Sequence, residues 1–185
     1  MNPLLFTDPA FLFCFAPVVL TTYYLLPASW RNAFLLTSSL VLYAWGEGRN
    51  VAALLASIAF NYACGAWIAR GGESSRRVLA FGVTANLLLL ALFKYAGFIV
   101  ANFDVFIRLF GLPSITVPKV RLPVGLSFFT FMAISYLVDV YRRQTDAEKN
   151  PATFALYISL FPHLIAGPIV RFKDIAEQLH GRIVT

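Results

Sequence analysis

Charged side chains are scarce in this sequence. Asp, Glu, Lys and Arg make up 13% of its 185 residues, whereas about 25% is usual for a soluble domain. The charges leave six long uncharged runs, at 9–30, 32–46, 50–69, 78–93, 122–138 and 150–170. A helix needs about 20 apolar residues to cross the hydrocarbon core of a bilayer. The pattern excludes an ordinary soluble globule and predicts an all-α, polytopic transmembrane protein with about six hydrophobic helices.

Metal-ligating and nucleophilic side chains are also few. The two cysteines, Cys14 and Cys64, form no CxxC pair and have no histidine nearby in the sequence, so no metal site is predicted. The two histidines are His163 and His180. The sequence contains no G-x-S-x-G, Walker, H-E-x-x-H or GxGxxG motif. These absences exclude the common soluble-enzyme classes, and we expect no bound cofactor.

The formal net charge is +6, but the basic residues lie at the ends of the apolar runs, where membrane proteins carry them. We therefore expect membrane lipid as a partner and no nucleic acid. Residues 1–10 contain no Lys or Arg, so they lack the basic region of a secretory signal peptide, and the first run is expected to remain as a span. The distribution of Lys and Arg places the N-terminus outside for the first four runs and leaves the later topology open.

Three stretches depart from a plain spanning helix. Pro17 lies in the middle of the first run and predicts a kink. Residues 95–112 fit an interfacial helix, a continuation of the fourth run or a further tilted span. Residues 171–182 are predicted to form an amphipathic helix that lies on a membrane surface or on a partner helix. Its apolar face holds Phe172, Ile175 and Leu179.

Several polar groups fall within or beside the apolar runs. Asn61 and Asn86 are each most simply explained as residues that form hydrogen bonds between helices, and Ser39 can bond back to its own helix. Lys94 can extend its charge to the membrane surface. Asp139 precedes Arg142 and Arg143 by three and four residues, so the simplest prediction is a salt bridge between them near the headgroups.

The last run ends in FPHLIAGPIV, which argues against a straight helix because Pro162, Gly167 and Pro168 interrupt it. Broken backbone at membrane depth survives only where protein or a water-filled cavity surrounds it. His163 lies in this break and can titrate near neutral pH, although no carboxylate lies within helical reach of it. His180, on the polar tail, is expected at the surface.

Six segments, in order, resemble the membrane-bound O-acyltransferase family, most closely its alginate-acetylating branch. They are LFTDPAFLF at the start, RNAFLLTSSLVLYAWGE in the second run, FNY in the third, FKYAGF at 93–98, LPVGLSFFTFMAISYLVDVYRR in the fifth run and LFPHLIAGPIVRFKDIAEQL at the end. Together they cover the chain from Leu5 to Leu179. The last segment is the most specific of them.

The resemblance implies a multi-pass enzyme of the bacterial inner membrane that passes an acetyl group to an extracytoplasmic polysaccharide such as alginate. It implies a tunnel that a donor enters from the cytoplasmic side, and a polysaccharide or periplasmic acetyl-transfer protein as partner. The candidate tunnel-lining residues are Pro162, His163, Gly167, Pro168 and Arg171. The family's catalytic histidine lies downstream of Thr185, so residues 1–185 are expected to be the N-terminal transmembrane part and inactive alone. No motif identifies the acyl donor.

Two other classes of protein remain compatible with the residues. A small transporter or channel would also explain the buried polar residues and the broken helix, although the sequence shows no inverted repeat. A non-catalytic membrane scaffold that docks a complete enzyme is the second alternative.

Overall fold

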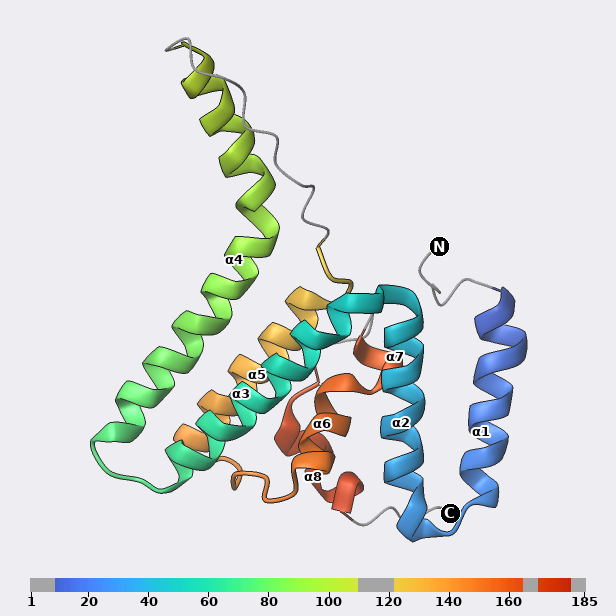
Figure 1. Cartoon of the computed structure of the whole chain (residues 1–185). Coiled ribbons are helices and arrows are strands. Elements are labelled where there is room, and N and C mark those ends of the chain that lie inside the picture. Colours follow the sequence, from blue (N-terminus) through green and yellow to red (C-terminus); the bar gives the residue numbers. More distant parts are fainter. Residues whose placement is uncertain (1–8, 110–121, 165–169, 181–185) are drawn as a thin grey trace.

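The computed structural model describes residues 9–109, 122–164 and 170–180, and all regular structure in these residues is helical (Figure 1). The elements are η1 (Phe11–Phe15), α1 (Ala16–Leu25), α2 (Ala28–Glu47), η2 (Gly48–Asn50), α3 (Val51–Ala69), α4 (Ser74–Leu109), α5 (Leu126–Tyr141), α6 (Pro151–Ser159), α7 (Phe161–Leu164) and α8 (Phe172–His180). The all-α prediction is confirmed for the described part of the chain.

The helices differ greatly in length. Two stretches are long and apolar enough to cross a membrane: Ala28–Ala69, which contains α2 and α3, and Ser74–Tyr95 in α4. Phe11–Leu25 and Leu126–Tyr141 are shorter apolar helices. Helix α6 has only 9 residues, which is about 14 Å of helix. The uncharged runs therefore all contain helix, but the last run does not form one spanning helix.

The first run contains two interruptions. Pro17 stands in the first turn of α1, directly after the π-helical turn η1; its missing N–H cannot bond to the preceding turn, which is the physical reason for the predicted irregularity. Helix α1 then stops at Leu25, five residues before the end of the uncharged run. Leu26 has ψ 144° because the residue before a proline, here Pro27, is driven out of the helical region.

For residues 95–109, helix α4 supports the second alternative, a continuation of the fourth run, since it continues without a break from Ser74 to Leu109. Residues 110–112 lie outside the described part of the chain. Its 36 residues make about 54 Å of helix, and its C-terminal part projects away from the other helices (Figure 1). Lys94 lies within this helix, and its Nζ is 5.7 Å from the centre of the Tyr95 ring.

The centre of the molecule is helix α5, which packs against α3, α4, α6 and α8. Tyr136 of α5 is fully buried and lies 4.6 Å from Phe154 and 5.3 Å from Phe172, ring centre to ring centre. Phe172 and Leu179 are the buried face of α8. The amphipathic tail helix is therefore confirmed from Phe172 to His180, and its apolar face lies on partner helices of the same chain.

Asn61 of α3 and Asn86 of α4 are both buried and face one another. The Asn86 amide donates to Asn61 Oδ1 at 2.7 Å, and the Asn61 amide donates to Asn86 Oδ1 at 3.2 Å. This reciprocal pair confirms the predicted interhelical hydrogen bond, which satisfies two polar groups that would be costly in lipid.

Candidate functional site

The candidate site is the broken helix at the end of the last uncharged run. Helix α6 begins as its sequence predicts, with the Asn150 side chain accepting from Ala152 N at 2.9 Å and Pro151 in the first turn. It ends at Ser159, because Leu160 leaves the helical region at ψ 117°. One further turn, α7, follows. The predicted break is therefore present, between Ser159 and Phe161.

The backbone freed by this break is bonded from another helix. The Phe161 N–H donates to Ser39 Oγ of α2 at 3.2 Å. The Ser39 side chain is buried, with 1% of its surface exposed. A donor at a buried helix start must find a partner, so Ser39 acts across the helix interface rather than only within its own helix, as the sequence had suggested.

The far end of α7 lies against the start of α5. Gly125 stands immediately before α5 in the left-handed region, at φ 77°. A Cβ at this position would lie 2.3 Å from the Leu164 carbonyl oxygen. A residue without a side chain is therefore required twice here, once by the backbone conformation and once by the close approach of α7.

Aromatic rings from the N-terminal element cover the same short helix. The Phe161 ring centre lies 5.6 Å from that of Phe15 and 6.1 Å from that of Phe11, both in edge-to-face geometry. The break thus contacts η1, α2 and α5.

After the break, the chain is held to α5 by an ion pair between Arg171 and Asp139. Arg171 contacts Asp139 with both arms of its guanidinium: Nε donates to Oδ2 at 3.1 Å, and Nη2 donates to Oδ1. Asp139 is fully buried, whereas the Arg171 side chain is 40% exposed. In the described residues its partner is therefore Arg171, 32 positions along the chain, and the predicted bridge to Arg142 or Arg143 is wrong. Both arginines are exposed where α5 ends.

The surroundings of this ion pair are also polar. Gln144 Oε1 accepts from Arg171 Nη2 and from Lys173 Nζ, both at 3.2 Å. The Tyr157 hydroxyl donates toward the Val170 carbonyl at 3.0 Å. Hydrogen bonding to Asp139 raises the pKa of Arg171 above its already high ordinary value, so this residue carries a fixed positive charge.

The predicted site residues are distributed along this segment. Pro162 and His163 lie in α7. Pro162 is exposed, and of His163 the structure describes the backbone. Gly167 and Pro168 lie outside the described residues. Arg171 meets Asp139 as described above. That these five residues line a tunnel stays a prediction.

Two cavities are lined by described residues outside 160–171. One of about 540 Å³ is bounded by the 145–150 loop and by Phe172 and Ala176 of α8. Another, of about 250 Å³, lies between α3 and α4 and includes Ser57 and Asn86 in its lining. The described part of the chain brings together no three His, Cys, Asp or Glu side chains that could hold a metal ion.

Comparison with known proteins gives this geometry its context. A protein of Azotobacter vinelandii named "Probable alginate O-acetylase AlgI" is 42% identical over 185 residues, which cover 98% of this chain and 37% of that protein. A Pseudomonas aeruginosa protein of the same name is 41% identical over 98% of this chain and 36% of its own length. This chain is homologous to the N-terminal third of the AlgI alginate O-acetylases.

The homology extends to a second kind of O-acetyltransferase. A Helicobacter pylori protein named "Peptidoglycan O-acetyltransferase" is 32% identical over 97% of this chain and 39% of its own length. The chain thus spans little more than a third of each relative. No protein-family model matches the sequence, and no solved structure matches it either. The predicted resemblance to membrane-bound O-acyltransferases is confirmed by these relatives.

Proposed function

We propose that this chain is the N-terminal, membrane-embedded part of an O-acetyltransferase of the bacterial inner membrane that modifies an extracytoplasmic polysaccharide. The observation that carries the proposal is the 42% identity to an alginate O-acetylase across 98% of the chain. The long apolar helices support it, and so does the break in the last run, because non-helical backbone is tolerated at membrane depth only where it is buried in protein or lines a water-filled cavity.

Within this proposal the segment from Leu160 to Arg171 forms part of the wall of the reaction path. Pro162, His163, Gly167 and Pro168 would face that path, while Arg171 fixes the segment to α5 through Asp139. The acetyl donor would enter from the cytoplasmic side. The acceptor would be the polysaccharide itself or a periplasmic protein that carries the acetyl group.

Alginate is the first candidate acceptor, because the relatives named for alginate are the more similar ones, at 37–42% identity. Peptidoglycan is the second, because one relative at 32% identity is named for it.

The test is removal of the gene that encodes this chain from its bacterium. Ester-bound acetyl would then be measured in the extracellular uronic-acid polymer and, separately, in purified peptidoglycan. We expect acetyl to be lost from one of the two polymers and restored by the intact gene. Loss from peptidoglycan alone would select the second acceptor, and unchanged acetylation of all surface polysaccharides would contradict the proposal.

A pair of histidine variants tests the role of the break. In the complementing gene, His163→Ala is expected to reduce acetylation roughly 10-fold or more if this side chain takes part in proton transfer, at unchanged abundance in the membrane fraction. His180→Ala, which changes the other histidine on the tail helix α8, is the matched control and should restore wild-type acetylation. Equal acetylation by the two variants would remove His163 from the site.

A further inference from the structure

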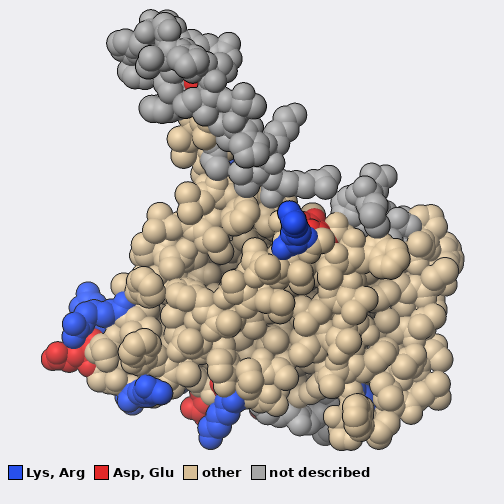
Figure 2. All heavy atoms as spheres, viewed as in Figure 1, with Lys and Arg blue, Asp and Glu red and all other residues tan. Residues whose placement is uncertain are grey.

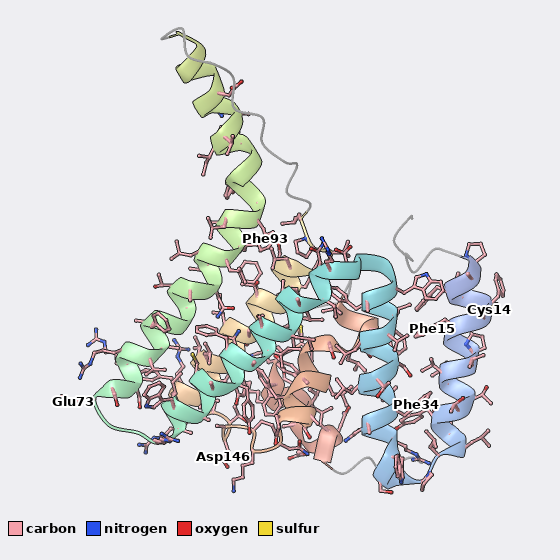
Figure 3. The ribbon with its side chains drawn as sticks, in the orientation of Figure 1. Cys14, Phe15, Phe34, Glu73, Phe93 and Asp146 are labelled. Atoms are coloured by element: carbon pink, nitrogen blue, oxygen red, sulfur yellow. The ribbon has the colours of Figure 1, made fainter. Side chains whose placement is uncertain are left out.

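The basic residues of the described chain gather at one end of the molecule. Figure 2 shows Lys and Arg side chains along the lower margin of a broad uncharged belt, with a smaller charged group at its upper margin. Figure 3 places Glu73 and Asp146, which mark two of the loops involved, at the same lower end, and Phe93 near the opposite end. The helix ends and loops at the lower end in Figure 1 are the start of α2, the α3–α4 loop, the α5–α6 loop and the start of α8, and their basic residues are Arg31, Arg70, Arg76, Arg77, Arg142, Arg143, Lys149, Arg171 and Lys173.

The last uncharged run starts at this basic end and breaks part of the way along α2. Helix α6 follows the loop at 142–150, and α7 meets Ser39 of α2 at Phe161. Ser39 lies about 17 Å along α2 from Ala28, whereas the whole of α2 is about 30 Å long. The break therefore lies between the two ends of α2.

The chain then returns to the end from which it came. Leu164 lies at the start of α5 against Gly125, whereas Arg171, seven residues later, is bonded to Asp139 near the other end of α5. That separation is about 20 Å along the helix, which seven residues can bridge. Further on, the Leu179 carbonyl accepts from the Asn32 amide, at the start of α2, at 2.7 Å.

We infer that the run at 150–170 is a re-entrant segment. It enters the membrane from the basic end, turns at the break beside Ser39 and Gly125, and leaves on the same side, so that α8 lies on the cytoplasmic surface. The fifth run is then the last complete crossing in the described chain, and the Asp139–Arg171 ion pair holds the returning limb.

Charge placement supports this topology. If the run crossed completely, Arg171 and Lys173 would lie on the side opposite to Arg142 and Arg143, and the basic residues would divide almost evenly between the two faces. The re-entrant path puts all four on one face with the basic residues of the loops at 27–31 and 70–77. An excess of Lys and Arg in short loops marks the cytoplasmic side, so this path also places the basic end of the molecule in the cytoplasm.

The buried polar groups agree with this path. Backbone that turns within the membrane must be bonded by protein, and Ser39 supplies an acceptor for the Phe161 N–H while the Tyr157 hydroxyl donates to the Val170 carbonyl. The inference rests on membrane insertion, which the proposed function shares, and not on acetyl transfer.

The test is the labelling of single cysteines by a membrane-impermeant maleimide in right-side-out and inside-out vesicles. The background carries Cys14→Ser and Cys64→Ala, and the reporters are Ser74→Cys, Arg49→Cys and Gln178→Cys, all at exposed positions. Ser74 marks the basic end, Arg49 marks the other end, and Gln178 lies on α8. Labelling after denaturation in detergent confirms that each thiol is present.

We expect Gln178→Cys to be labelled in the same vesicles as Ser74→Cys and protected in those where Arg49→Cys reacts. Labelling of Gln178→Cys together with Arg49→Cys would show that the run crosses completely and would overturn the inference. Protection of Gln178→Cys in both kinds of vesicle would place α8 within the membrane and overturn it as well. Neither result depends on acetylation, so a failure of the proposed enzymatic function would be seen separately.

Discussion

At the scale of single residues, the least expected feature is a carboxylate with no exposed surface whose partner comes from a distant part of the chain. Asp139 is buried under α8, and Arg171 reaches it from the exposed side with a two-pronged contact. The two residues of this ion pair differ in burial, since Asp139 is fully buried and Arg171 is partly exposed. If the arginine is removed, a charge stays buried without its counter-ion, which is far more costly than leaving a charged group in water.

Three variants of the Asp139–Arg171 ion pair compare the cost of leaving Asp139 buried without its counter-ion with the cost of leaving Arg171 unpaired in water. Arg171→Gln is expected to lower the apparent melting temperature in detergent by roughly 6–12 °C. Asp139→Asn should lower it less, because Arg171 stays hydrated, and the double variant should recover part of the loss of Arg171→Gln. Lys173→Gln is the matched control, since Lys173 donates to Gln144, a neighbour of the ion pair, rather than to Asp139. Equal losses for Arg171→Gln and Lys173→Gln would show that the ion pair is unimportant.

At the scale of the elements, the short helix α7 is held from three directions. Ser39 accepts its first N–H, Phe11 and Phe15 cover its aromatic side, and Gly125 allows its last carbonyl to approach α5. A single helical turn has little stability of its own, because nucleation is unfavourable. Its conformation therefore depends on these contacts.

Gly125 and Gly71 form a natural comparison. Both have positive φ, 77° and 78°, but a Cβ at Gly71 would meet nothing within 4 Å, whereas one at Gly125 would collide with the Leu164 backbone. Alanine at either position incurs the cost of a positive φ. We expect Gly125→Ala to reduce the free energy of unfolding by about 1–3 kcal/mol more than Gly71→Ala, measured by denaturation in mixed micelles. Equal effects would mean that the contact with α7 is relaxed in solution.

At the scale of the whole molecule, the exposed surface is as informative as the core. Trp30, Trp45 and Trp67 have 65%, 64% and 57% of their surface exposed, and all three stand within three residues of an end of α2 or α3. Trp30 and Trp67 lie at the basic end and Trp45 at the other. Tryptophan at such positions is typical of the two membrane–water interfaces.

Fluorescence quenching by brominated lipids tests this arrangement. In vesicles, lipids brominated near the headgroup are expected to quench tryptophan emission more strongly than lipids brominated near the chain ends. Variants that retain one tryptophan at a time, with phenylalanine at the other two positions, should each show this order. Absence of quenching by any brominated lipid would show that the three indole rings face protein or water instead of lipid.

The sequence by itself determined much of this protein. The scarcity of charge predicted apolar helices, the Asn-Pro pair predicted the start of α6, and the proline and glycine residues of the last run predicted its break. Asn61 and Asn86 were correctly predicted to form interhelical hydrogen bonds, because a polar amide inside an apolar span has few other partners, but the structure alone showed that they bond to each other. The family resemblance was carried by six local segments. Each of these signals depends on neighbours within a few turns of one helix.

Only the tertiary structure decided which groups meet across the molecule. The sequence assigned Asp139 to Arg142 and Arg143, because they are its nearest basic residues on the same helix, but the partner is Arg171, which the return of the chain brings to the same end. Ser39 and Gly125 gave no local signal of their roles, since each acts on α7 from another element. Helical periodicity reports which face is apolar; the path of the chain through the bundle determines what that face meets.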